Sequence, residues 1–318
     1  MNQDTSPPVL QTLSPAAERL LGLRIDVDTH DGMKTGVPPL LDLLNKAGVK
    51  GTFYLSMGPD NAGKAILNVL QRPGFLSKMR RTKALRMYGL RTVLSGTVLP
   101  ARMIAVALPE VARRIVAEGH EVGVHAWDHR RWQDRLESLS EAQVARELAR
   151  AFEAFVEVFG APPKTFAAPA WFASDASLSF QENFGLDYAS DCRGEEPFIP
   201  VVGGAALVTP QVPTTLPTLD EALGDTHSVA RAFFTSALVA AGKARWPVLT
   251  VHAELEGGPF ADDMEWFLEQ AAEAGIRVTT LRELLTARCA TGKPLPRRTM
   301  GHGTVPGRHG KVSMPVVG

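Results

Sequence analysis

The chain has 318 residues, of which 45% are hydrophobic and 21% are charged, so it can form one large globular domain or two small ones. Its formal net charge of zero excludes a general electrostatic attraction to nucleic acid or to membranes. The two cysteines, Cys192 and Cys289, lie far apart and predict no disulfide framework. The N-terminal stretch lacks the features of a signal peptide, and no apolar run reaches the roughly 18 residues of a spanning helix. We therefore expect a cytoplasmic protein.

Strand-like and helix-like segments alternate along the chain, which favours an α/β fold with a mostly parallel sheet, open or closed into a barrel. Residues 1–18 form a polar arm. A single domain is expected over residues 19–288, with an insertion at about 72–108. Residues 289–318 are rich in Gly, Pro and basic residues and are expected to be disordered. The expected strands are 21–27, 51–56, 120–125, 165–168, 186–190, 206–211 and 248–252, and the expected helices are 37–47, 109–118, 140–160, 262–274 and 281–287.

Ionisable residues stand at the ends of three of these strands, where parallel α/β folds place their chemistry. After the first strand come Asp26 and Asp28, which at strand spacing share one face. The alternative is that Asp28 or Asp31 caps the following helix. His125 and His129 follow the strand at 120–125, and a pair four residues apart can present two imidazoles to one metal ion.

The third strand end carries His252, in Thr250-Val251-His252. A single histidine that ends an apolar strand is often structural. The three features together change that interpretation, because one Asp and two His form a ligand set with an open position for water. A second Asp and a third His then remain for proton transfer.

These motifs resemble the NodB-homology polysaccharide deacetylases. The similarity is closest to the branch that removes the formyl group from undecaprenyl-phosphate-linked 4-deoxy-4-formamido-L-arabinose. It covers nearly the whole core, and the segments that carry it are LRIDVDT, GVPPLLDLL, GPDNAG, EVGVHAWDH, SDCRG, TLPTLDE and TVHAELEG.

The resemblance implies an irregular (β/α) barrel with one divalent metal ion. Asp28, His125 and His129 would be its ligands, a set that suits Zn, Co or Mn. Asp26 would be the general base that activates water, and His252 the general acid that protonates the departing amine. Candidate substrate-binding residues are Asp60, Asn61, Trp171, Arg193 and Glu254.

One segment departs from the family pattern. Many members carry an Arg that steadies the base, within an R-x-P-Y motif. The corresponding stretch here, residues 167–171, contains no Arg. Arg193 supplies the missing charge in one interpretation, and in the other it pairs with Asp191.

Residues 58–65 come close to the nucleotide-binding pattern G-x-x-x-x-G-K-[ST]. The chemistry argues against it, because Ala65 has no hydroxyl for magnesium, Pro59 lacks an N–H and Asp60 would repel phosphate. Asp60 and Asn61 either line the sugar pocket or shape a turn.

The stretch between Asn61 and Pro109 contains no Asp or Glu but many Lys and Arg residues interleaved with apolar ones, including Arg80, Arg81 and Lys83. This pattern fits docking at the anionic inner face of the cytoplasmic membrane. An amphipathic helical cover is the alternative. Nucleic acid is not expected as a partner, because no binding motif is present.

The resemblance thus predicts a peripheral hydrolase that deformylates a lipid-linked sugar for aminoarabinose modification of lipid A, within lipopolysaccharide biosynthesis, and so for polymyxin resistance. A deacetylase of another N-acyl sugar is an alternative within the same class. The alternative from another class is a non-catalytic glycolipid-binding protein with the same fold.

Overall fold

The computed structural model describes residues 19–63, 95–96, 100–222, 227–308 and 310–316. The expected N-terminal arm and most of the basic insertion, including Arg80, Arg81 and Lys83, lie outside the described residues. Lys64 and Ala65 of the rejected nucleotide-binding pattern lie outside them as well. Among the residues described, no helix combines the length and the apolar composition needed to cross a bilayer.

A parallel sheet organises the molecule, in the strand order β5-β4-β3-β2-β1-β8, with β9 pairing the start of β1. The chain forms an incomplete, irregular (β/α) barrel, as the sequence predicts. The strands of this sheet are β1 (Arg19–Val27), β2 (Thr52–Leu55), β3 (Glu121–Val124), β4 (Thr165–Phe166), β5 (Tyr188–Ala189), β8 (Val248–His252) and β9 (Ile276–Thr279). Because every pairing in it is parallel, the carboxyl ends of its strands meet along one edge.

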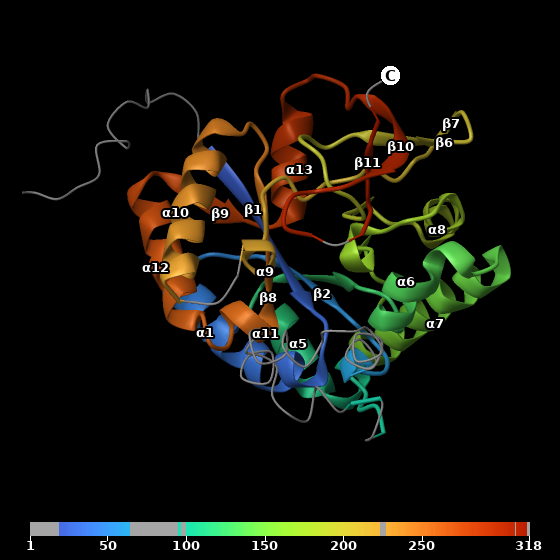
Figure 1. The fold of residues 1–318 in the computed structure, drawn as a ribbon, viewed down its shortest axis with the longest axis horizontal. Helices are drawn as coiled ribbons and strands as arrows, with labels where there is room; N and C mark the ends of the chain where they lie inside the picture. The colour runs from blue at the N-terminus through green and yellow to red at the C-terminus, as the bar shows by residue number, and fades with distance from the viewer. Residues whose placement is uncertain (1–18, 64–94, 97–99, 223–226, 309, 317–318) are drawn as a thin grey trace, which may run out of the picture.

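Helices flank the sheet. In Figure 1, α1, α10 and α12 gather at one end of the molecule and α6, α7 and α8 at the other. The helices are α1 (Val37–Ala47), α5 (Pro109–Ala117), α6 (His129–Arg135), α7 (Glu141–Phe159), α8 (Asp175–Gln181), α9 (Leu219–Ala222), α10 (His227–Lys243), α11 (Ala253–Glu256), α12 (Ala261–Glu273) and α13 (Leu281–Ala290). Short helical turns lie at Gly32–Gly36, Ala105–Ala107, Leu136–Ser138, Pro169–Trp171 and Glu182–Phe184.

Local sequence explains where several elements begin and end. Helix α7 starts with the predicted capping box of Ser140 and Gln143 and ends at Gly160, which adopts a left-handed conformation. Helix α1 has Pro in its first turn and ends at Gly48 in the same left-handed conformation. These signals allow α1 to be predicted from the sequence with its observed bounds.

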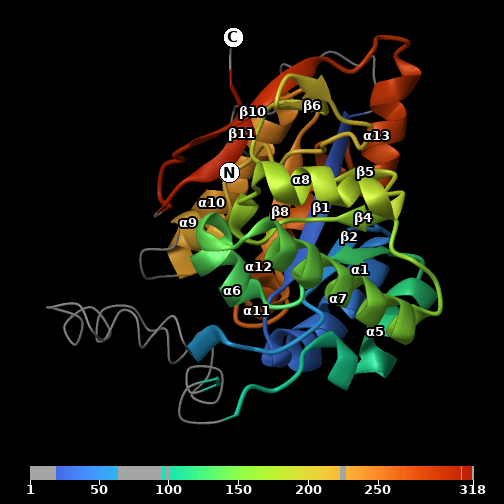
Figure 2. The same cartoon turned by 90° about the vertical axis from the view of Figure 1, so that its right-hand side faces the viewer.

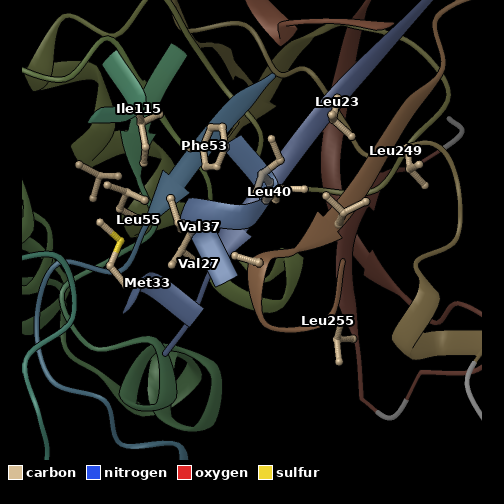
Figure 3. Close-up of a cluster of buried hydrophobic side chains, with 14 of the residues drawn as sticks. Leu23, Val27, Met33, Val37, Leu40, Phe53, Leu55, Ile115, Leu249 and Leu255 are labelled. Atoms are coloured by element: carbon tan, nitrogen blue, oxygen red, sulfur yellow. The ribbon is translucent and has the colours of Figure 1, made fainter. Parts of the chain in front are cut away.

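The hydrophobic core surrounds β1, whose residues from Leu21 to Val27 are all buried. Figure 3 shows Leu23 and Val27 of this strand close to Phe53 of β2 and Leu40 of α1. Leu21, Leu23, Ile25 and Val27 pack in this core, whereas Arg24 and Asp26, which alternate with them, are buried on the other face of the strand. The core therefore holds rigidly the strand that ends in Asp26 and Asp28.

The structure corrects two expectations. Residues 206–211 do not form a strand: β7 (Ala205–Ala206) is short, and Gln211 makes only isolated bridges. The segment expected to be a disordered tail is ordered, because β10 (Arg297–Gly303) pairs with β6 (Ile199–Val202) and with β11 (Val312–Pro315). Backbone hydrogen bonds to a distant strand order a segment that has few apolar residues to bury. Figure 2 shows β10 and β11 beside β6.

Candidate active site

Five ionisable side chains predicted from the sequence meet at the carboxyl edge of the sheet. Asp26 and Asp28 leave the end of β1, His125 follows β3, and His129 is the first residue of α6. His252 ends β8, directly opposite Asp26 in the parallel register. Residues separated by more than 200 positions in the sequence thus face one cavity, as the strand-end argument requires.

Asp28, His125 and His129 form a compact cluster whose candidate ligand atoms all lie within 4.8 Å of one another. The Nε2 atoms of His125 and His129 lie 3.4 Å from the two carboxylate oxygens of Asp28. Oδ1 of Asp28 is buried and has no hydrogen-bond partner among the described residues. A buried, unpartnered carboxylate oxygen beside two imidazole nitrogens is the donor set that a divalent metal ion requires.

The environment of both histidines leaves a ring nitrogen available to bind a metal ion. Nδ1 of His125 lies 2.7 Å from the carbonyl oxygen of Ala167, so this nitrogen donates and leaves Nε2 free to act as a ligand. Burial, partly opposed by the charge of Asp28, lowers the pKa of His129 to about 4, so its ring is neutral at neutral pH. Burial opposes ionisation of Asp28, but His129 and His125 outweigh it and lower the pKa of this carboxyl. The three residues therefore fit a divalent metal ion.

The position of His129 depends on a turn after β3. Ala126 has a φ of 94°, an unusual conformation for a residue with a side chain, and Asp128 caps α6 through the N–H of Arg131. Nδ2 of Asn61 donates to the second oxygen of Asp128 at 2.7 Å. Asn61 therefore braces the turn that carries His129.

Asp60 and Asn61 serve the scaffold rather than the cavity. The carboxylate of Asp60 is buried and accepts hydrogen bonds from the backbone N–H groups of His30 and Ala62. Neither Asp60 nor Asn61 lines the central cavity. Of the two interpretations of this pair, the structure supports the one in which they shape the turn.

The alternative that Asp28 or Asp31 caps a helix is wrong. The helical turn Gly32–Gly36 has no side-chain cap at Asp31, which instead pairs with Arg102 at 2.6 Å. The hydroxyl of Thr29 accepts from the N–H of Gly32. Asp28 therefore caps no helix, and its carboxylate is available to the cluster with His125 and His129.

Arg24 takes the place of the missing motif arginine. Its Nε and Nη2 donate to the two carboxylate oxygens of Asp26, both at 2.7 Å, and its Nη1 donates to the carbonyl of Ser190 at 2.5 Å. Burial opposes ionisation of Asp26, but Arg24 and then His125 outweigh it and lower the pKa of this carboxyl. A bidentate contact with an arginine stabilises the ionised form of a carboxylate and fixes its orientation. Asp26 is thereby held as an ionised carboxylate in a fixed orientation.

Neither interpretation of Arg193 is correct. Its guanidinium pairs with Glu221 at 2.9 Å and donates to the carbonyl of Leu216. Asp191 instead accepts from the N–H of Ala168 and from the side chain of Gln211. Arg193 is therefore part of the wall behind the cavity and supports neither Asp26 nor Asp191.

His252 is surrounded by carboxylates. Its Nδ1 lies 3.8 Å from Oδ1 of Asp220, and its backbone N–H donates to Glu256 at 2.9 Å. Burial alone would lower the pKa of His252, but Asp220 and then Asp28 and Asp26 outweigh it and raise it to about 9. His252 is therefore a cation at neutral pH and can donate a proton.

Glu254 anchors the loop that follows β1. Its Oε1 accepts from the N–H groups of Asp28 and Thr29, at 2.9 and 2.8 Å, and from the hydroxyl of Thr29. Its Oε2 has no hydrogen-bond partner among the described residues, and the side chain lines the cavity. Glu254 thus orients the loop that carries Asp28 and offers one oxygen to the cavity.

The side chains surround an open cavity of about 310 Å³, a size that suits a sugar ring. Trp171 and Glu254 line it, as expected of substrate-binding residues, whereas Arg193 does not. The lining residues are Asp26, Asp28, Thr29, His125, His129, Gln133, Ala170, Trp171, Asp220, Glu221, His252, Glu254, Gly307 and Arg308.

Comparison with known proteins agrees with this geometry. A family model described as polysaccharide deacetylase matches residues 27–189. A protein of Shewanella sediminis named 4-deoxy-4-formamido-L-arabinose-phosphoundecaprenol deformylase ArnD is 37% identical over 83% of this chain and 85% of its own length. A protein of the same name from Wigglesworthia glossinidia brevipalpis is 32% identical over 89% of this chain and 97% of its own length.

Solved structures show the same fold. A polysaccharide deacetylase of Mycobacterium smegmatis superimposes with a TM-score of 0.61 at 21% identity, covering 89% of this chain and 95% of that one. An acetyl xylan esterase of Clostridium thermocellum, solved with a cobalt ion, gives a TM-score of 0.50 at 18% identity, covering 85% of this chain and 92% of that one.

The family match and the two ArnD relatives identify the chain as a hydrolase that acts on an amide C–N bond. The chain belongs to the polysaccharide deacetylase family, and its likeness to the two ArnD proteins extends over most of its length.

Proposed function

We propose that this protein hydrolyses the formamide of undecaprenyl-phosphate-linked 4-deoxy-4-formamido-L-arabinose, releasing formate and the free 4-amino sugar. The observation that carries the proposal is the convergence of Asp26, the cluster of Asp28, His125 and His129, and His252 on one sugar-sized cavity. The names of the two relatives supply the substrate. The product would serve lipid A modification with aminoarabinose and hence polymyxin resistance.

In the proposed mechanism, Asp28, His125 and His129 hold one divalent metal ion. Such an ion supplies Lewis-acid polarisation of the amide carbonyl and makes water more acidic. Zn, Co and Mn all suit one carboxylate and two imidazoles, and the related esterase was solved with cobalt.

The proton transfers belong to Asp26 and His252. The carboxylate of Asp26, kept unprotonated by Arg24, takes a proton from the water that attacks the formyl carbon. As the C–N bond breaks, His252 gives its proton to the nitrogen, because an amide anion is too poor a leaving group to depart unprotonated. The amine leaves neutral, and formate takes the water oxygen.

Mass spectrometry of the glycolipid tests this function. Incubation with the protein and Zn, Co or Mn should remove the mass of one formyl group and release one formate per sugar. The 4-acetamido analogue, run in parallel, tests the alternative that the protein is a deacetylase. An unchanged formamido glycolipid with all three metals would refute the proposed reaction.

The charge of His252 should limit activity at high pH. Because His252 acts when protonated and its pKa is raised to about 9, kcat should fall as pH rises through this value. Asp220→Asn removes the carboxylate that raises this pKa most, so the decline should begin at lower pH. The exposed carboxylate of Asp262, away from the cavity, provides the control: Asp262→Asn should leave the pH profile unchanged. A decline at the same pH in Asp220→Asn and wild type would show that His252 is not the acid.

We also propose that the basic insertion docks the protein on the inner face of the cytoplasmic membrane. Gly63 and Ser95 flank residues 64–94, which include Arg80, Arg81 and Lys83, and the N–H of Gly63 donates to the carbonyl of Ser95 at 3.1 Å. Arg102 pairs with Asp31, in the loop that follows β1. The basic stretch is thus joined, through Arg102, to the loop whose residues Asp28 and Thr29 line the cavity.

Charge reversal tests this docking. The triple change of Arg80, Arg81 and Lys83 to Glu should abolish sedimentation with vesicles that contain anionic lipid, because each basic residue near such a surface contributes about 1 kcal/mol of attraction. Turnover of a soluble short-chain substrate should be unaffected. Equal vesicle binding by the triple variant and wild type would refute membrane docking through this segment.

A further inference from the structure

The C-terminal hairpin brings a basic residue into the active-site cavity. Arg308, between β10 and β11, lines this cavity although it lies more than 50 residues beyond His252. It also lines a second cavity of about 360 Å³, which shares Gln133 and Ala170 with the first. The two cavities therefore meet at Arg308, and Lys311 lines the second one farther out.

Several contacts fix the hairpin in this place. Nε2 of His302 donates to the carbonyl of Ala173 at 3.0 Å, and the hydroxyl of Ser313 accepts from the N–H of the same residue at 2.9 Å. Ser313 also accepts, through its carbonyl, from the N–H of Arg193. The hairpin is thereby bound to Ala173, just after Trp171, and to the backbone of Arg193, whose side chain packs on the Trp171 ring.

Gly307 allows the close approach that positions Arg308. Its φ is 79°, and a Cβ atom there would lie 2.5 Å from the carbonyl oxygen of Glu221. Both the left-handed conformation and the contact exclude a larger residue without a shift of the backbone. The position of Arg308 is therefore built into the chain.

The charge of Arg308 is only partly compensated. Its guanidinium stacks on Trp171, 4.6 Å from the ring centre, and its Nη1 lies 3.8 Å from Glu221. That carboxylate is already bound by Arg193 at 2.9 Å and by the N–H of Thr218. Within the described part of the chain, the guanidinium of Arg308 has no closer acceptor, so its donors remain available to a ligand.

The proposed substrate carries an anion on the opposite side of the sugar ring from the amide. In the proposed substrate the formamide is on C4 and the phosphate on C1, which lie opposite each other across the pyranose ring. With the formamide at Asp28 and His252, the phosphate lies across the sugar ring from these two residues, within the reach of other residues that line the cavity. Asp134, on the side of the second cavity, is itself paired with Arg130 at 2.7 Å, so it does not repel a phosphate with its full charge.

We propose that Arg308 binds the phosphate attached to the sugar, at the junction of the two cavities, and so makes the enzyme selective for sugar phosphodiesters over neutral glycosides. The inference rests on the proposed function. Arginine suits this task because its planar set of N–H donors matches phosphate oxygens.

A pair of soluble substrates tests the proposal: a short-chain phosphodiester of 4-deoxy-4-formamido-L-arabinose and the methyl glycoside of the same sugar. Wild type should favour the phosphodiester by about tenfold or more in kcat/KM, as one charge-assisted hydrogen bond predicts. Arg308→Gln should raise KM for the phosphodiester by about 10- to 100-fold, with KM for the methyl glycoside unchanged. Arg308→Lys, which keeps the charge, should give an intermediate KM and serves if the Gln variant does not fold.

Arg297 provides the control, because it is exposed, lies on the same hairpin and lines neither cavity. Arg297→Gln should change neither KM. Equal effects of Arg308→Gln on both substrates, or no preference of wild type for the phosphodiester, would overturn the role of Arg308 while leaving deformylation intact. Release of formate from neither substrate by wild type would refute the proposed function, and the role of Arg308 with it.

Discussion

His129→Ala is expected to remove the bound metal ion and to reduce formate release by a factor of about 1,000 or more. The reason is that losing a ligand costs more than the roughly 10- to 100-fold penalty for losing an outer partner of a ligand. Because His129 begins α6 and its ring faces Asp28, truncation leaves a two-residue set that holds a divalent ion weakly. Metal content by elemental analysis and formate release measure the two effects.

Arg135 is the matched control. It lies on the same helix, is exposed and lines neither cavity, so Arg135→Ala should keep both metal and turnover. A glycolipid-binding protein without catalysis makes a different prediction: His129→Ala would keep its affinity for the sugar lipid, and wild type would release no formate. Full turnover by His129→Ala would contradict the assigned ligand set.

Arg24→Gln should lower both kcat and stability strongly. The change leaves the buried carboxylate of Asp26 without its charged partner, which costs about 3–5 kcal/mol of unfolding free energy. In the protein that remains folded, kcat should fall by about 100-fold, in the range of a lost general base, since Asp26 is no longer oriented toward water. KM and metal content should change little, because Arg24 contacts neither the cavity nor the metal cluster.

The Arg193→Gln variant is the control that distinguishes a loss of Asp26 orientation from a general loss of stability. Arg193 packs on the same Trp171 ring and is also paired with a carboxylate, Glu221, but it does not contact Asp26. Its replacement should lower the melting temperature while kcat stays within about threefold of wild type. Equal losses of kcat in the Arg24 and Arg193 variants, after correction for folded protein, would show that Arg24 has only a structural role.

The main features of the site could be predicted from the sequence because parallel strands share a direction. Once β1, β3 and β8 are recognised, the residues that follow them must lie at one edge, which brings Asp28, His125 and His252 together. Arg24 also had a signal in the sequence: it stands two residues before Asp26 on the same strand, so both side chains share one face. A charged residue within a buried apolar strand requires a partner, and the nearest one on that face is Asp26.

Other features depended on contacts that the sequence does not show. Strand β10 forms by pairing with β6, about 100 residues earlier, and composition alone suggests disorder because backbone pairing leaves little trace in residue type. The roles of Asp220, in the short helix α9, and of Arg308, between β10 and β11, arise in the same way, since tertiary packing sets the place of each segment beside the cavity. For Asp60 and Asn61, nearness to a strand end was a poor guide, because both side chains turn toward the scaffold.

The central claim is that Asp28, His125 and His129 hold one divalent metal ion within reach of Asp26 and His252. Crystals grown with cobalt, measured at its absorption edge, test this claim most directly. We expect one anomalous peak per chain, bonded to a carboxylate oxygen of Asp28 and to Nε2 of both histidines. A peak at other residues, or none at saturating cobalt, would contradict it.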